Sequence, residues 1–254
     1  MKKQIMDTES IKIMLQNFTY GILYITNRFL SKFFILKHSK KFNYKIIPFG
    51  NYCLPRVITT INGLKSTRNE GEKSFPFDLC YSNFNDNCKL LSNNFDGFYD
   101  DLKFDKGKYV NSKFNMIFNH DNIPLDEFKA RYNKRIDNLY FYVKCRTNHL
   151  FFIVATFELI TPIQIDFFIK EISKYRAPKT YTVIIINQSK EKAIYGNENV
   201  RCIDLHKDTL FNKINKKDDW VGELKRMNKF QAKVFNYKVS SKLQKIIKST
   251  ADLK

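Results

Sequence analysis

The sequence predicts an α/β fold with a mostly parallel central sheet, flanked by helices and with helical additions at both ends. Three consecutive segments carry this prediction. Residues 150–157 are a continuous apolar run of strand length, Thr161-Pro162 is a typical helix start, and 181–186 are rich in β-branched residues. Strand, helix and strand in so short a stretch indicate a right-handed βαβ unit whose two strands are buried.

Upstream of this unit, the sequence predicts a short strand that begins at Lys45 and ends at the turn formers Gly50-Asn51. A helix is expected next over 54–64, because Pro55 is tolerated in a first turn. The other expected elements are a loop at 74–78, short helices and turns over 83–102, a strand at 116–118, an amphipathic helix from Leu125 to Leu139 and a strand at 200–205.

Composition divides the chain into three parts. We expect residues 1–44 to be a basic amphipathic N-terminal segment, 45–215 to be the α/β domain that would carry any chemistry, and 216–254 to be a basic helical C-terminal tail. The N-terminal segment repeats apolar residues at helical spacing with basic residues between them. Such a segment either lies on an anionic membrane or partner, or packs on its own domain.

The charge balance restricts the classes of partner. The 254 residues hold 44 Lys+Arg against 25 Asp+Glu, a net charge of +19, while 43% are hydrophobic. So much apolar material excludes global disorder and suits one large domain. The charge attracts nucleic acid, acidic glycans or an anionic membrane, or merely keeps a lysine-rich surface soluble. Nucleic acid is not the expected partner, because no nucleic-acid-binding motif accompanies the charge.

The cysteines predict the compartment. Five cysteines, an odd number, stand without a C-x-x-C pair or a zinc-ligand spacing, so neither a disulfide framework nor a metal site is expected. Asp7 and Glu9 come before any apolar run, which argues against a secretory signal. No apolar stretch is long enough to span a bilayer. We therefore expect a cytoplasmic protein, either free or peripheral at the inner membrane face.

Cys53 is the first candidate for chemistry. A strand, a glycine-containing turn and a cysteine that opens a helix place the sulfur at the positive end of the helix dipole. That position favours the thiolate and predicts a lowered pKa, to which Arg56, one turn along, adds positive potential. Against this, most cysteines are small apolar residues of the core.

His120 is the candidate base. A thiol nucleophile needs a base within hydrogen-bond reach and a third group that orients it. His38 and His206 lie in charged stretches and His149 precedes a strand, whereas His120 ends a strand and is followed by Asp121. A lone histidine is nevertheless more often structural than catalytic.

Four short motifs occur in order, and together they carry a family resemblance. They are Gly50-x-x-Cys53, Pro76-Phe77-Asp78, Phe118-x-His120-Asp121 and the segment Arg131-Tyr132-Asn133-Lys134-Arg135-Ile136. Over about residues 45–187 the chain resembles an uncharacterised bacterial family described as papain-like cysteine peptidases. It departs from that family at Leu79, where tryptophan is usual, and at Asn133-Lys134-Arg135, which replaces paired arginines.

The resemblance implies roles for these residues. Cys53 becomes the nucleophile, His120 its base and Asp78 the leading third member, although Asp78 could instead cap the following helix. Asp121 either orients the imidazole or holds the loop, and Arg131 and Arg135 bind an anionic substrate or are merely solvated. The candidate substrate-binding residues are Asn51, Arg56, Asp121, Arg131 and Arg135.

The expected function is cysteine-dependent acyl transfer by a papain-like thiol hydrolase or transferase. Its substrate would be a peptide, an acyl compound or a glycan, and no cofactor is required. One alternative is an O-acyltransferase that modifies a surface polysaccharide with an acyl thioester donor such as acyl-CoA. The other is a non-catalytic basic adaptor that binds nucleic acid, acidic glycan or a membrane surface, in which Cys53 is structural. No particular oligomeric state is predicted.

Overall fold

A computed structural model describes most of the central part of the chain. The described residues are Ile22, 43–50, 52–61, 63–65, 71–189, 191–205 and 229–252, without the side chains of 61, 229–237 and 252. Asn51, nearly all of the N-terminal segment and the boundary expected at 215 lie outside them.

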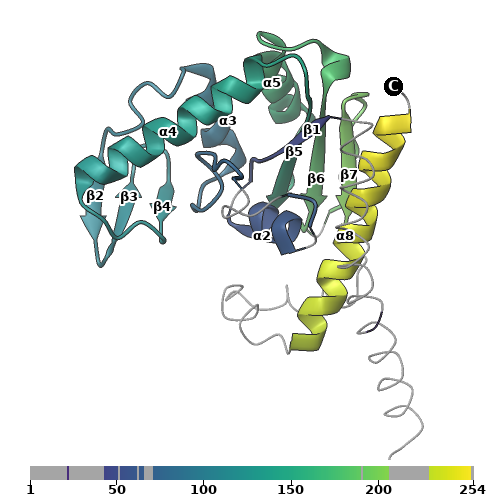
Figure 1. Ribbon diagram of the computed structural model, residues 1–254, viewed down its shortest axis with the longest axis horizontal. Coiled ribbons are helices and arrows are strands. Elements are labelled where there is room, and N and C mark those ends of the chain that lie inside the picture. The colour runs from purple at the N-terminus through teal and green to yellow at the C-terminus, as the bar shows by residue number, and fades with distance from the viewer. Residues whose placement is uncertain are drawn as a thin grey trace, which may run out of the picture.

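Four parallel strands form the central sheet in the order β1-β5-β6-β7 (Figure 1). Both β5 and β6 are buried over their whole length, as expected for inner strands with helices on both faces. The predicted α/β class and the strand–helix–strand unit are therefore confirmed. The bounds are β1 (Tyr44–Pro48), β5 (His149–Thr156), β6 (Tyr181–Asn187) and β7 (Val200–Asp204).

Helices cover the two faces of this sheet. Because strand side chains alternate between the faces, Phe152 packs in one core cluster with Phe168 of α5, whereas Phe151 packs in the other with Ile58 of α2 and Leu243 of α8. Thr161 caps α5 in a capping box, as predicted in part from Thr161-Pro162. The bounds are α2 (Leu54–Ile61), α3 (Phe84–Ser92), α4 (Leu125–Lys144), α5 (Pro162–Ser173), the 3-10 turn η2 (Pro178–Thr180) and α8 (Lys229–Asp252).

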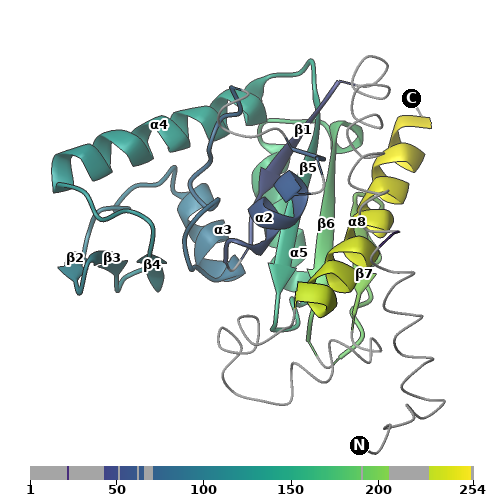
Figure 2. The ribbon, with the colours of Figure 1, turned by 60° about the horizontal axis from the view of Figure 1, so that its bottom comes forward.

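A second, antiparallel sheet lies beside the half of α4 that is farther from the central sheet (Figures 1 and 2). It consists of β2 (Leu102–Asp105), β3 (Lys108–Asn111) and β4 (Met116–Phe118). Only β4 was predicted from the sequence. The missed signal is the pair Lys106-Gly107, which joins β2 to β3 with φ of 47° and 80° and thus has the geometry of a two-residue hairpin turn.

The described part of the C-terminal segment is helical, as expected, and packs on the domain. Val239, Leu243 and Ile247 of α8 are buried with side chains of the central sheet, while Lys242 and Lys245 are exposed. The apolar side of this part of α8 is therefore used by the core. Among the described helices, none is long and apolar enough to cross a membrane.

Candidate active site

Cys53 lies at the carboxyl edge of the central sheet, where ligands of open α/β sheets usually bind. It follows β1 and begins α2, because its carbonyl accepts the hydrogen bond of the Val57 N–H at 3.0 Å. The preceding Tyr52 is buried, stacks on Phe157 with ring centroids 4.8 Å apart and accepts a hydrogen bond from Gln188. Phe157 follows β5 and Gln188 follows β6, so three strand ends hold this turn.

Gly50 sets the path of the chain into Cys53. A Cβ at this position would lie 2.8 Å from the backbone nitrogen of Ala155 and 3.2 Å from its oxygen. The turn therefore passes against the backbone of β5 at a distance that only glycine permits. The Ser82 hydroxyl also donates to the Gly50 carbonyl at 3.3 Å.

His120 comes from the second sheet, two residues after the end of β4. An isolated antiparallel bridge between Tyr81 and Ile117 ties β4 to the segment near Cys53, with N–O distances of 2.8 and 2.9 Å. This bridge connects the small sheet to the chain that follows Asp78. It therefore brings the end of β4 toward the carboxyl edge of the central sheet.

The two candidate catalytic side chains meet. Cys53 Sγ lies 3.6 Å from His120 Nε2, although 67 residues separate them in the sequence. Cys53 is half-buried and His120 is exposed, so the contact is open to solvent on one side. A thiol at this distance from an imidazole nitrogen can transfer its proton to it.

The prediction of a low-pKa thiolate is wrong. Burial raises the pKa of the Cys53 thiol, and the negative charge of Asp78 raises it further, against the lowering by the residue's own N–H. The N–H of Cys53, at the start of α2, therefore does not outweigh the loss of hydration. Cys145 is the thiol whose pKa is lowered, by hydrogen bonds with Thr147.

Asp78 does not bond to His120. It is 1% exposed, and its Oδ2 accepts a hydrogen bond from Arg56 Nη1 at 2.8 Å, while its Oδ1 has no hydrogen-bond partner in the described part of the chain. Burial raises the pKa of Asp78, against the lowering by Lys65 and Arg56. Asp78 thus anchors the first turn of α2 through Arg56. Arg56, which was predicted to bind substrate, is therefore engaged in an ion pair with Asp78.

Asp121 is held by α4. Its buried carboxylate accepts hydrogen bonds from Arg131 Nη1 at 2.6 Å and from the Tyr132 hydroxyl at 2.9 Å, and lies 3.5 Å from Arg135 Nη1. Within the described residues it has no hydrogen bond to His120. Asp121 was predicted either to orient the imidazole or to hold the loop, and this geometry favours holding the loop that carries His120.

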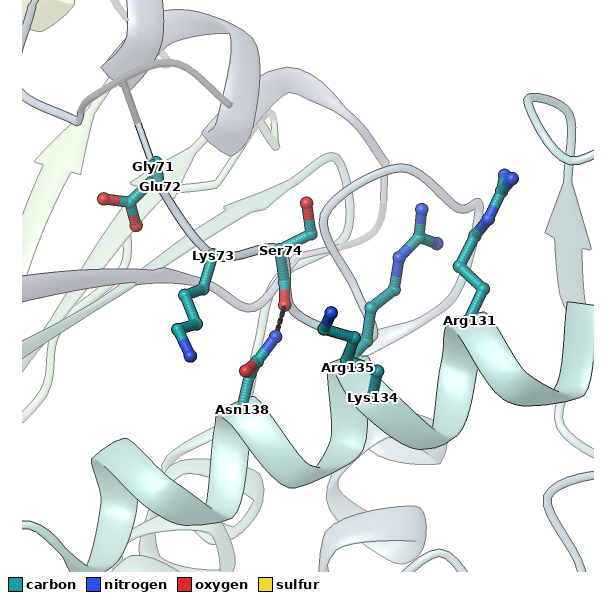
Figure 3. A pocket seen from close by; sticks show the side chains of 8 residues that line it. All are labelled: Gly71, Glu72, Lys73, Ser74, Arg131, Lys134, Arg135 and Asn138. Atoms are coloured by element: carbon teal, nitrogen blue, oxygen red, sulfur yellow. Dashed lines mark hydrogen bonds between the residues drawn. The ribbon is translucent and has the colours of Figure 1, made fainter. Parts of the chain in front are cut away.

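Arg131 and Arg135 also line a cavity together with Lys73 and Lys134, two cations that were not among the predicted substrate-binding residues (Figure 3). Lys73 follows Gly71 in a segment without regular structure, and Lys134 is one turn along α4 from Arg131. The spacing of basic residues on α4 was visible in the sequence. The opposite wall of the cavity, formed by the segment with Lys73, depends on tertiary packing and was not visible.

Comparison of the chain with family models, curated proteins and solved structures finds no match. The resemblance to papain-like cysteine peptidases therefore rests on the four motifs and remains a proposal. Among the described residues, no group of three or more His, Cys, Asp or Glu side chains is placed to hold a metal ion.

Proposed function

We propose that this protein catalyses cysteine-dependent acyl transfer, with Cys53 as nucleophile and His120 as base. The observation that carries the proposal is the 3.6 Å contact between Cys53 Sγ and His120 Nε2. Its setting adds support, because the contact lies at the carboxyl edge of a parallel sheet and at the first turn of a helix.

The raised pKa of Cys53 determines how the reaction begins. At neutral pH the thiol is protonated, so His120 Nε2 accepts the thiol proton as the sulfur bonds to the substrate carbonyl carbon. Backbone N–H groups of Cys53 and Leu54, at the start of α2, donate to the oxygen that becomes negative. The oxyanion then re-forms the carbonyl, and the leaving group departs with the proton from His120.

The product of this first half is an acyl thioester on Cys53. Water or an acceptor hydroxyl next gives its proton to His120 and attacks the thioester carbonyl. The thiolate leaves and recovers the proton from His120, which completes the cycle. A hydrolase and an O-acyltransferase thus share every residue up to the acyl-enzyme and differ in the acceptor.

The location that fits this chemistry is the cytoplasm. All five cysteines are free thiols, and a reducing compartment keeps a nucleophilic cysteine active. The lysines exposed on α8 could also contact an anionic membrane surface, which fits a peripheral position.

The test is to trap the acyl-enzyme. The full-length chain, Cys53→Ala and Cys145→Ser are incubated with simple acyl thioesters and with activated peptide esters, and the adduct is located by intact mass and peptide mapping. We expect an acyl adduct on Cys53 that is retained in Cys145→Ser and lost in Cys53→Ala. Adding water-soluble glycans or amines then identifies the acceptor through faster loss of the adduct.

The opposite result would favour the adaptor. If acyl groups reach only Cys145, or no donor modifies Cys53 above the rate of an exposed thiol, the reading of Cys53 as a nucleophile is refuted. The basic charge of the chain would then be its main functional feature.

A further inference from the structure

A cavity of about 300 Å³ opens between α4 and the segment 71–74, apart from the Cys53–His120 contact. Figure 3 shows Arg131 and Arg135 extending from α4 to the same side. Asn138 donates to the Ser74 carbonyl at 3.1 Å and so joins the two walls. The lining residues are Gly71, Glu72, Lys73, Ser74, Arg131, Lys134, Arg135 and Asn138.

The lining is strongly cationic. Four side chains carry positive charge and only Glu72 carries negative charge. That carboxylate already has two partners outside the lining, Lys45 Nζ at 2.6 Å and Lys65 Nζ at 2.9 Å. Lys73 and Lys134 are exposed and form no ion pair with any described residue. The cavity therefore keeps an excess of positive charge that no described residue neutralises.

Arg135 holds part of this positive charge in a fixed position. Its side chain is only 9% exposed and its guanidinium lies over the Tyr132 ring, 4.4 Å from the centroid. Its Nη1 is buried, lies 3.5 Å from Asp121 Oδ2 and makes no hydrogen bond within the described residues. The guanidinium is therefore held in place at the cavity wall by Tyr132 and Asp121, and its positive charge would attract an anionic ligand in the cavity.

We propose that this cavity binds a phosphate-bearing group. Two arginines and two lysines match a dianion or a diphosphate better than a single carboxylate, because four positive charges line the cavity and Arg131 donates only one of its N–H groups to Asp121. The volume suits a diphosphate or a small phosphorylated group. Resting on the proposed acyl transfer, we further assign the cavity as the site for the phosphate end of an acyl donor or acceptor, since Asp121 connects it to His120.

The binding test uses inorganic phosphate and pyrophosphate, with acetate as the monoanion, titrated calorimetrically into the full-length chain at low and moderate salt. The cavity variant is Lys73→Gln/Lys134→Gln. The matched control is Lys103→Gln/Lys170→Gln, two exposed lysines that do not line the cavity. We expect pyrophosphate to bind more tightly than acetate, and the cavity variant to lose about tenfold or more in affinity while the control loses less than twofold.

Equal losses in the two variants would assign the binding to general surface charge and overturn the proposal. The Cys53→Ala protein separates this proposal from the proposed reaction. If it binds pyrophosphate as the original chain does and no acyl-enzyme ever forms, the anion site stands and the acyl-transfer function fails.

A second readout tests the assignment to the substrate. Acyl donors that carry a phosphate are compared with phosphate-free donors of the same acyl group. We expect Lys73→Gln/Lys134→Gln to raise KM about tenfold for the phosphorylated donor alone, with little change in kcat. An equal KM for both donors in the original chain would refute a donor subsite, and the same comparison with phosphorylated acceptors would then decide the remaining assignment.

Discussion

The two sheets of this protein hold the two halves of the candidate dyad in different ways. Cys53 begins a helix whose preceding turn is packed against the backbone of β5, next to the buried Tyr52. His120 is an exposed residue beyond a three-residue strand, and its position depends on the Tyr81–Ile117 bridge and on the partners of Asp121. The nucleophile is thus positioned by the core, whereas the base is positioned by a few polar contacts.

The largest expected effect comes from removing the polar contacts on the histidine side. Asp121→Ala leaves the Tyr132 hydroxyl without its acceptor and the buried Arg135 without its nearest carboxylate. We expect a loss of about 3 kcal/mol in the free energy of unfolding, because breaking a buried ion pair leaves an uncompensated charge. Chemical denaturation measures the loss, with Asp137→Ala, at an exposed position of α4, as control. A loss no larger than that of the control would show that the base is not held in this way.

On the nucleophile side, the critical contact is steric. Gly50→Ala places a methyl group 2.8 Å from the Ala155 nitrogen, so the turn before Cys53 must move. We expect a loss of about 1–3 kcal/mol in unfolding free energy together with slower acylation of Cys53. Gly196→Ala is the matched control, because a Cβ there meets nothing within 4 Å. Unchanged stability and acylation in Gly50→Ala would contradict the tight packing of this turn.

The order in which the cysteines are alkylated tests the relative pKa values of their thiols. With limiting iodoacetamide at neutral pH we expect Cys145 to react before Cys53, because hydrogen bonds from Thr147 lower the pKa of Cys145 while burial raises that of Cys53. Peptide mapping at short times measures the order. Cys53 reacting first at pH 6 would restore the low-pKa thiolate predicted from the sequence.

A smaller effect distinguishes two roles for Asp78: a buried charge that acts on the pKa of Cys53, and a hydrogen-bond acceptor that orients His120. Its charge contributes to the raised pKa of Cys53, so Asp78→Asn should move the alkylation midpoint of Cys53 to lower pH. The shift should be less than the effect of burial, the larger cause. A hydrogen bond from Asp78 to His120 would instead make the variant lose turnover without such a shift.

Asp78 also affects the pH dependence of stability. Burial raises its pKa, so between the unfolded value of 3.8 and the raised folded value the native state holds more protons than the unfolded state. This carboxyl group therefore makes stability fall as the pH rises through that window. Denaturation of the original chain and of Asp78→Asn at several pH values measures the difference, and parallel curves would contradict it.

The elements that the sequence predicted well are those whose pattern matches their final environment. β5 and β6 are inner strands and read as continuous apolar runs, and Thr161-Pro162 marks the start of α5 with its own side chain. The hairpin of β2 and β3 was missed because its strands have four residues each, and β2 is largely exposed while β3 buries every second residue. An alternation over four residues is too short to give a clear periodic signal.

For the candidate site, the sequence predicted Cys53 and His120 as partners, and their side chains lie 3.6 Å apart, but it did not predict the surroundings of the two residues. The positive end of α2 is a local property, and it was visible in the order of strand, turn and helix. The burial of Cys53 and the nearby charge of Asp78 depend on tertiary packing, which is why the direction of the pKa shift was misjudged. The pairing of Asp78 with Arg56 joins residues 22 apart and has no local signal.

The most direct test of the dyad is the pH profile of acylation of Cys53 in the Cys145→Ser background, with and without His120→Ala. If His120 is the base for a protonated thiol, removing it should slow acylation at pH 7 by about 10²-fold or more, and the two rates should converge above the thiol pKa, where no base is needed. Equal rates at pH 7, in two proteins of equal stability, would contradict the account.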